Sequence, residues 1–237
     1  MSLKEAVDKL GIEFWNWRMK QQPRSHDDIP RLERVENWLP AWSESDIATY
    51  RVALKEFQAR YESIEFINFD DTAFDKETYV DYRLIGSAIS RVYWELDHLK
   101  SWQEQPRFYI DQTIGVVFDL LLAPAVTDKR ISEVALVLAN SPQILQDGLA
   151  NLSGNSVREY AIVAIELLGN IEVEVNRMVE ELASFAEPST VNSLKLAGDR
   201  AIAAFLNFRE WLESNQKDMK QIQPVGRNKY QWFFDHV

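Results

Sequence analysis

The sequence predicts an all-α protein: an irregular bundle of about seven to eight helices around a long central helix over about 156–185. Only eight glycines and eight prolines interrupt 237 residues, fewer than the usual shares of about 7% and 5%. Apolar residues recur every three or four positions along most of the chain, which is the spacing of one helix face. With 46% hydrophobic residues the chain can build a large core, and we expect one domain over residues 1–237.

The central helix is predicted from the stretch between Asn155 and Phe185, which contains no proline and a single glycine, Gly169. Its apolar residues fall within a stripe roughly 160° wide at about 100° per residue. Ile162 and Ile165 lie off this stripe, so the first half should pack on two sides. The stripe comprises Tyr160, Val163, Ala164, Leu167, Leu168, Ile171, Val175, Met178, Val179 and Leu182.

The other predicted helices are bounded by cap residues, prolines or glycines. Asp75 or Thr72 caps the third, Pro124 closes the fourth, and Pro188 occupies a first turn, where proline is tolerated. The fourth helix is apolar on all sides, which predicts a buried position. In chain order they cover residues 3–21, 43–65, 75–102, 108–122, 127–138, 142–152 and 188–214.

The tail over residues 219–237 differs from the rest of the chain because its aromatic residues are crowded together. Tyr230, Trp232, Phe233 and Phe234 stand almost side by side. Large aromatic residues gathered at a terminus usually pack against another surface. We therefore predict that these four residues and Arg227 contact either a missing half of a larger protein or a second copy of the chain.

Composition excludes several classes of protein. The net charge of −11 argues against a nucleic-acid partner. No apolar run approaches the ~18 residues of a membrane span, and the absence of cysteine excludes disulfides and thiolate metal sites. Since Met1-Ser2-Leu3-Lys4-Glu5 lacks the pattern of a signal peptide, we expect a cytoplasmic protein, or a periplasmic or secreted one if a leader was removed.

The histidines offer little support for a metal site. His26, His98 and His236 are the three in the chain, and none belongs to a His-Glu-x-x-His motif. Glu95 and His98 do have the Glu-x-x-His spacing of di-iron helices, but no second such pair exists. On a regular helix they would point about 110° and about 170° from the apolar stripe, so we expect both to face solvent.

Two carboxylates, Asp111 and Asp119, lie on the most apolar predicted helix, where a buried charge needs a partner. Asp111 could interact with the helix dipole, and Asp119 could pair with an arginine such as Arg130. Acid–base chemistry with raised pKa values is the alternative. The sequence shows neither a Gly-x-Ser-x-Gly serine motif nor a glycine-rich phosphate loop, so it predicts no catalytic and no cofactor-binding residue.

Several fragments, taken in order, are similar to a bacterial family known as domain of unknown function 885. They are Phe14-Trp15-Asn16-Trp17-Arg18, Asp81-Tyr82-Arg83-Leu84-Ile85, Trp102, Pro106-Arg107-Phe108-Tyr109, Arg130, Leu138, Pro142, Leu145, Ala150-Asn151-Leu152, Val157 and Pro224-Val225-Gly226-Arg227-Asn228-Lys229-Tyr230. The last resembles the Gly-Arg-x-x-Tyr turn of the family. Members look like zinc-dependent peptidases with an all-helical, channel-forming fold.

One departure from the family limits what the resemblance implies. The zinc-binding His-Glu-x-x-His helix of the family follows the Gly-Arg-x-x-Tyr turn, whereas this sequence ends seven residues after Tyr230. The resemblance therefore implies the N-terminal half of such a protein: a non-catalytic wall of a peptide channel, with zinc only in a longer chain. The alternative is a stand-alone interaction or scaffold domain that docks through residues 224–237.

Overall fold

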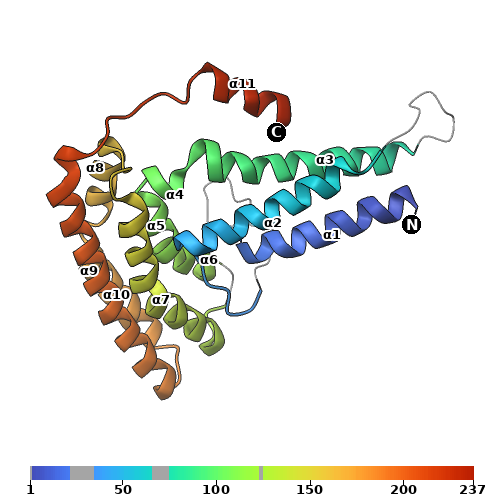
Figure 1. Ribbon diagram of the computed structural model, residues 1–237. Coiled ribbons are helices and arrows are strands. Elements are labelled where there is room, and N and C mark those ends of the chain that lie inside the picture. The colour runs from blue at the N-terminus through green and yellow to red at the C-terminus, as the bar shows by residue number, and fades with distance from the viewer. Residues whose placement is uncertain (1, 22–34, 66–74, 123–124) are drawn as a thin grey trace. The chain divides into compact units, whose positions relative to one another are not determined.

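The computed structural model describes residues 2–21, 35–65, 75–122 and 125–237 (Figure 1). Within these ranges the chain is helical apart from its connections and an isolated bridge between Val157 and Lys220, which confirms the predicted all-α class. The described chain divides into two compact units: a first unit of residues 2–21, 45–65, 75–100 and 223–237, and a second unit of residues 35–44, 101–122 and 125–222. The single domain over residues 1–237 stays a prediction. Thr72, Pro124 and His26 lie outside the described residues.

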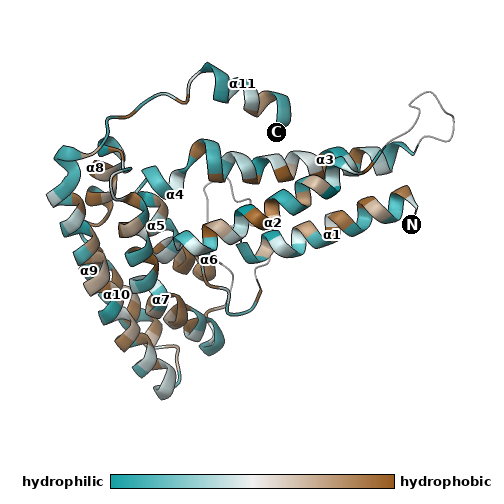
Figure 2. Ribbon diagram, in the orientation of Figure 1, coloured by the Kyte–Doolittle hydropathy of each residue, from teal (hydrophilic) through white to brown (hydrophobic). Residues whose placement is uncertain are grey.

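The first unit contains three long helices: α1 (Leu3–Gln21), α2 (Glu44–Glu62) and α3 (Lys76–Tyr93). The π-helix η1 (Trp94–Leu99) continues α3, and α11 (Arg227–His236) belongs to the same unit. Apolar and polar residues alternate along the helices, as expected where one face is buried (Figure 2). In the core, the Phe14 ring of α1 meets the Phe57 ring of α2 edge to face, with centroids 5.5 Å apart.

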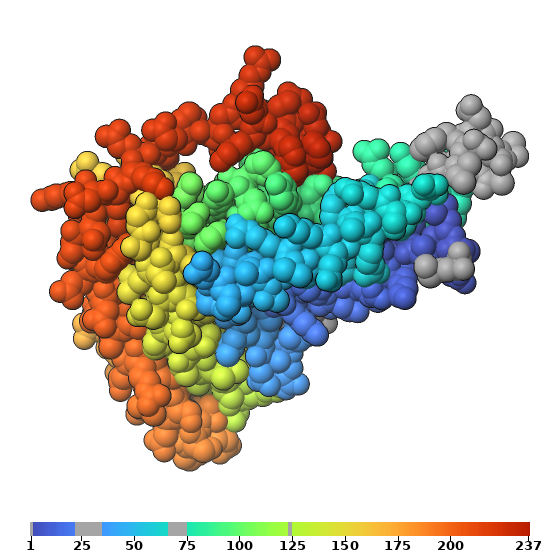
Figure 3. All heavy atoms as spheres, viewed as in Figure 1, coloured from blue at the N-terminus to red at the C-terminus, as the bar shows by residue number. Residues whose placement is uncertain are grey.

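The second unit begins with short helices and ends with long ones. The helices α4 (Ser101–Glu104), α5 (Arg107–Ile110), the π-helix η2 (Asp111–Gly115) and α6 (Val116–Leu122) come first. They are followed by α7 (Asp128–Leu152), α8 (Arg158–Leu167), α9 (Ile171–Ala183), α10 (Pro188–Asn215) and the 3₁₀ turn η3 (Gln216–Asp218). The longest two, α7 and α10, pack against each other, and between them they contact most other helices of this unit. Figure 3 shows their atoms side by side on one face of the molecule.

The predicted central helix over 156–185 is wrong as a single element, because the chain forms α8 and α9 with a break between them. At the break Gly169 donates its backbone N–H to Glu166 O, and Asn170 has φ −116° and ψ 16°. A glycine inside a helix costs about 1 kcal/mol relative to alanine. Ending the helix at Gly169 therefore gives up little helix stability. Of the two residues predicted to pack on a second side, Ile162 is 39% exposed and Ile165 is partly buried.

The two helices predicted over 127–138 and 142–152 are instead one helix, α7, with Pro142 inside it. Proline removes one backbone hydrogen bond, here to the carbonyl of Leu138, and costs about 3 kcal/mol. Burial on both sides of the proline offsets that cost: Ile131 and Leu138 before it, and Ile144 and Leu145 after it, are 2% exposed or less.

Candidate functional site: the C-terminal helix and its aromatic seat

The helix α11 forms most of the aromatic tail that the sequence singled out. Gly226 precedes it with φ 83°, a left-handed conformation that favours glycine. The helix packs against α3 (Figure 1). The earlier part of the tail is held in the second unit, where Lys220 exchanges backbone hydrogen bonds with Ser156 and Arg158.

The inner face of α11 packs on three rings at the end of α3 and in η1, which we call the aromatic seat: Tyr93, Trp94 and His98. The indole of Trp232 lies nearly parallel to that of Trp94, at 7° with centroids 6.2 Å apart. Its centroid lies 4.5 Å from the His98 ring and 5.5 Å from the Tyr93 ring. Phe233 adds an edge-to-face contact with Trp94 at 5.1 Å. These contacts partly bury two of the tail aromatics within the chain itself.

Two polar contacts fix the helix along the seat. Lys229 Nζ donates a hydrogen bond to the backbone carbonyl of His98 at 2.9 Å. Near the other end of α11, Ser87 Oγ donates to the carbonyl of Val237 at 2.8 Å. Because net hydrogen bonds contribute about 1 kcal/mol each, most of the docking free energy should come from the rings.

The outer face of α11 remains accessible. Tyr230 is 59% exposed and Phe234 is 64% exposed, and their rings meet edge to face with centroids 4.7 Å apart. Arg227 is exposed as well. Of the five predicted contact residues, the structure therefore places Trp232 and Phe233 on the seat and leaves Arg227, Tyr230 and Phe234 in solvent.

The sequence missed the seat because it placed Glu95 and His98 on a solvent-facing side of a regular helix. The structure corrects both positions: Arg18 and Glu95 form an ion pair, and His98 stacks on Trp94 and meets the ring of Trp232 at a tilt of 33°. A π-helix has i→i+5 hydrogen bonds, so the widened turn at 94–99 moves later residues away from the angles of a regular helix. Neither the apolar spacing nor the composition of this segment signals that widening.

Metal ligands and buried acids were the other candidates. Within the described ranges no group of three or more His, Asp and Glu side chains is placed to hold a metal ion, and zinc in a longer chain stays a prediction. Asp111 pairs with Arg107 one turn earlier, at 3.4 Å, so it has a side-chain partner as well as any dipole interaction. Asp119 is half-buried on α6.

The described helices include none that is both long and apolar enough to cross a bilayer.

The environment of His98 predicts that α11 docks more weakly at acidic pH. Burial lowers the pKa of His98 below its usual value of about 6.5, and the cation of Lys229 lowers it further. Lys100 and His236 act in the same direction, while Asp97 opposes them. The Nε2 atom is buried and has no hydrogen-bond partner among the described residues. Docked α11 therefore favours the neutral ring. The contribution of His98 to docking is fully present above about pH 6.5 and is lost as the pH falls below that value.

Fluorescence energy transfer between two dyes would measure how the docking of α11 depends on pH. The chain has no cysteine, so cysteines introduced at the exposed positions Val80 on α3 and Arg227 on α11 can carry a fluorescence energy-transfer pair. We expect transfer to change between pH 7.5 and pH 5 as α11 leaves the seat. The substitution His98→Gln should abolish the change and His236→Gln should preserve it. An equal response in the wild type and His98→Gln would contradict the role of His98.

Comparison with known proteins gives a similarity of fold. No family model and no curated protein matches this sequence. A solved structure described as "a putative lipoprotein of unknown function from Shewanella oneidensis" is similar, with a TM-score of 0.68 and 18% sequence identity. The match covers 92% of this chain and 38% of that chain. This chain therefore spans well under half of its structural neighbour, and at this identity the similarity concerns the fold alone.

Proposed function

We propose that this chain is the non-catalytic helical wall of a larger protein that resembles the zinc-dependent peptidases of domain of unknown function 885. In that role it lines a channel for a peptide substrate and leaves zinc binding and hydrolysis to the segment that the family places after the Gly-Arg-x-x-Tyr turn. The proposal rests on the ordered fragments that end in Pro224-Val225-Gly226-Arg227-Asn228-Lys229-Tyr230. The fold supports only its coarser part, a piece of a larger protein, because 92% of this chain is matched within a solved chain of which it spans 38%.

The geometry of α11 supports this role. Its inner face is held by Trp94 and His98, so the helix has a defined position on the first unit. Its outer face presents Tyr230 and Phe234, which are exposed by 59% and 64%. Exposed aromatic pairs on a fixed helix are typical contact residues of interfaces. In the proposed protein they would meet the remainder of the polypeptide.

A second candidate function is a stand-alone interaction domain that docks through residues 224–237, with a second copy of the chain as its partner. The exposed Tyr230–Phe234 pair favours this role too. The two candidates differ in what the isolated chain should do. As a wall it should be a monomer that awaits the rest of its protein, and as an interaction domain it should associate with itself.

One set of measurements on the purified chain tests both candidates. For the wall we expect no stoichiometric zinc by elemental analysis, no hydrolysis of fluorescent casein and a monomer by light scattering; stoichiometric zinc or chelator-sensitive hydrolysis would overturn it. If the chain associates with itself and the double substitution Tyr230→Ser/Phe234→Ser abolishes that association, the result favours the stand-alone interaction domain. Phe185→Ser is the matched control, because Phe185 is also 64% exposed but follows α9.

A further inference from the structure

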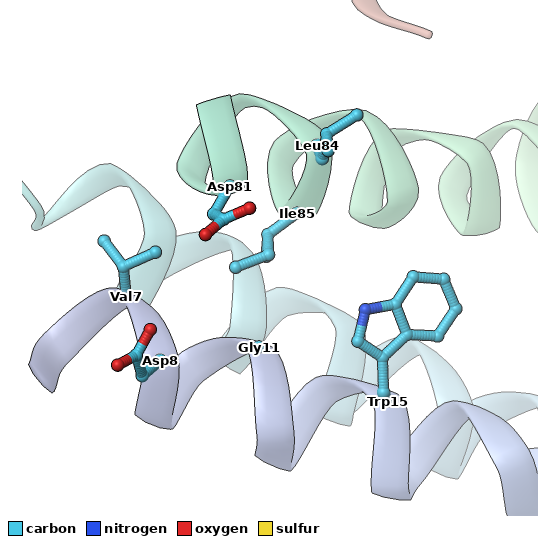
Figure 4. A pocket seen from close by; sticks show the side chains of 7 residues that line it. All are labelled: Val7, Asp8, Gly11, Trp15, Asp81, Leu84 and Ile85. Atoms are coloured by element: carbon cyan, nitrogen blue, oxygen red, sulfur yellow. The ribbon is translucent and has the colours of Figure 1, made fainter. Parts of the chain in front are cut away.

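A groove between α1 and α3 of the first unit has a volume of about 410 Å³ and is lined by four residues of α1 and three of α3 (Figure 4). Gly11 lets the Ile85 side chain approach α1 closely. A Cβ at this position would lie 3.1 Å from Ile85 Cδ1, so any side chain would displace Ile85 and change the lining of the groove. Ile85 is buried and forms part of its lining.

The walls of the groove combine accessible apolar surface with an aromatic ring. Leu84 of α3 is 62% exposed and Trp15 of α1 is 43% exposed. Figure 4 shows the indole of Trp15 standing up from α1 toward α3. An exposed indole beside aliphatic side chains offers both a hydrophobic surface and a π face that attracts cations.

The charged residues that line the groove are both acidic. Asp8 of α1 and Asp81 of α3 line it from opposite helices, and no lining residue is basic. The carboxylate of Asp8 has an exposed partner, Lys4 Nζ, at 3.4 Å. The carboxylate of Asp81 has neither a hydrogen bond nor an ion pair with any described residue, and it points from α3 toward α1 (Figure 4).

We propose that this groove binds an arginine side chain of a peptide, with an apolar residue beside it. The aliphatic stem of the arginine would lie on Leu84 and Ile85, as long cationic side chains do on apolar surfaces. The guanidinium would then reach Asp81, which can accept two parallel N–H donors, and the face of Trp15. Arginine fits better than lysine because its planar group both stacks on rings and pairs with carboxylates. The groove is a different surface from α11, and peptide binding there does not depend on the function of that helix.

The proposal is tested by titrating the ¹⁵N-labelled full chain with two blocked peptides, Gly-Ser-Leu-Arg-Ser-Gly and the same peptide with citrulline in place of arginine. Citrulline keeps the shape and removes the charge. We expect shifts of the amide signals of Gly11, Asp81 and Leu84 and of the Trp15 indole N–H. Affinity for the citrulline peptide should be lower by about fivefold, as exposed ion pairs and cation–π contacts imply.

Substitutions then assign the effect to the groove. Asp81→Asn should weaken binding of the arginine peptide about threefold and leave binding of the citrulline peptide unchanged. Glu56→Gln, an equal change of charge at an exposed position of α2, should alter neither. Gly11→Ala should weaken the binding of both peptides. Equal affinity for the two peptides, no effect of Asp81→Asn, shifts confined to other helices, or no shifts at millimolar peptide would each overturn the proposal.

Discussion

Replacing Gly148 by alanine should lower the free energy of unfolding of the second unit by about 2–3 kcal/mol, although alanine is the better helix former. A Cβ at this position of α7 would lie 2.7 Å from Cγ, 2.9 Å from Cδ1 and 3.0 Å from Cδ2 of the Tyr109 ring. These distances are shorter than real carbon contacts allow. Either α7 or the ring must move, and both are part of the core.

The ring of Tyr109 cannot move without breaking other contacts. Tyr109 is fully buried, and its hydroxyl donates a hydrogen bond to the carbonyl of Trp102. The same hydroxyl accepts from Asn151 Nδ2 at 2.8 Å, and Asn151 also donates to the carbonyl of Trp42. A displaced ring would leave these buried polar groups unpaired, at about 1–3 kcal/mol for each lost partner.

Urea unfolding followed by circular dichroism would measure the effect of Gly148→Ala. Gln146→Ala is the matched control, because Gln146 is exposed on the same helix and alanine there tests helix propensity alone; its effect should stay within about 0.5 kcal/mol. A Gly148→Ala protein as stable as the wild type would show that α7 and Tyr109 do not approach this closely.

The sequence predicted helices where local signals and packing agree. The bounds of α1 are those expected from its apolar spacing and the proline that follows, and Asp75 caps α3 by accepting the N–H groups of Glu77 and Thr78 at 3.1 Å each. Pro188 starts α10 as predicted. In each case a cap or a proline marks the boundary and no tertiary contact opposes it.

Periodicity failed where packing decides whether a helix continues. Leu168 and Ile171 flank the break between α8 and α9, and both are buried at the three-residue spacing of an unbroken helix. The apolar pattern therefore runs through the break without a signal, and only Gly169 and Asn170 hint at it. Pro142 is the opposite case. Proline usually ends a helix, but α7 continues through Pro142 because residues before and after the proline are buried.

For the candidate site, the sequence identified one partner of the contact and missed the other. Crowded aromatics predicted contacts with a missing half or a second copy, and those contacts stay a prediction. The structure shows Trp232 and Phe233 packed against a surface of the same chain. That the surface is the end of α3 and the π-helix η1 depends on a backbone distortion, which composition and spacing do not encode. The groove between α1 and α3 was likewise beyond reach, since it requires two helices far apart in the sequence to be placed side by side.

Replacing Arg18 by methionine should destabilise the first unit by about 2–3 kcal/mol. Arg18 is only 8% exposed on α1, and its guanidinium pairs with Glu95 of η1, whose side chain is 28% exposed. Breaking a buried pair by removing one partner costs about 3–5 kcal/mol, because the remaining charge is left without compensation. Partial exposure of Glu95 lets water solvate it, so we expect a value below that range.

A double-substitution cycle separates the lost charge from lost packing. Arg18→Met/Glu95→Gln should recover part of the stability, because the neutral amide no longer requires a cation. The control is Arg60→Met, since Arg60 pairs with Glu13 between α2 and α1 while both side chains are more than 40% exposed; it should cost less than about 1 kcal/mol. Equal costs for Arg18→Met and Arg60→Met in urea unfolding would show that the buried pair does not hold η1 against α1. A larger cost at Arg18 would mean that the π-helix, and with it the aromatic seat of α11, is stabilised by this single guanidinium.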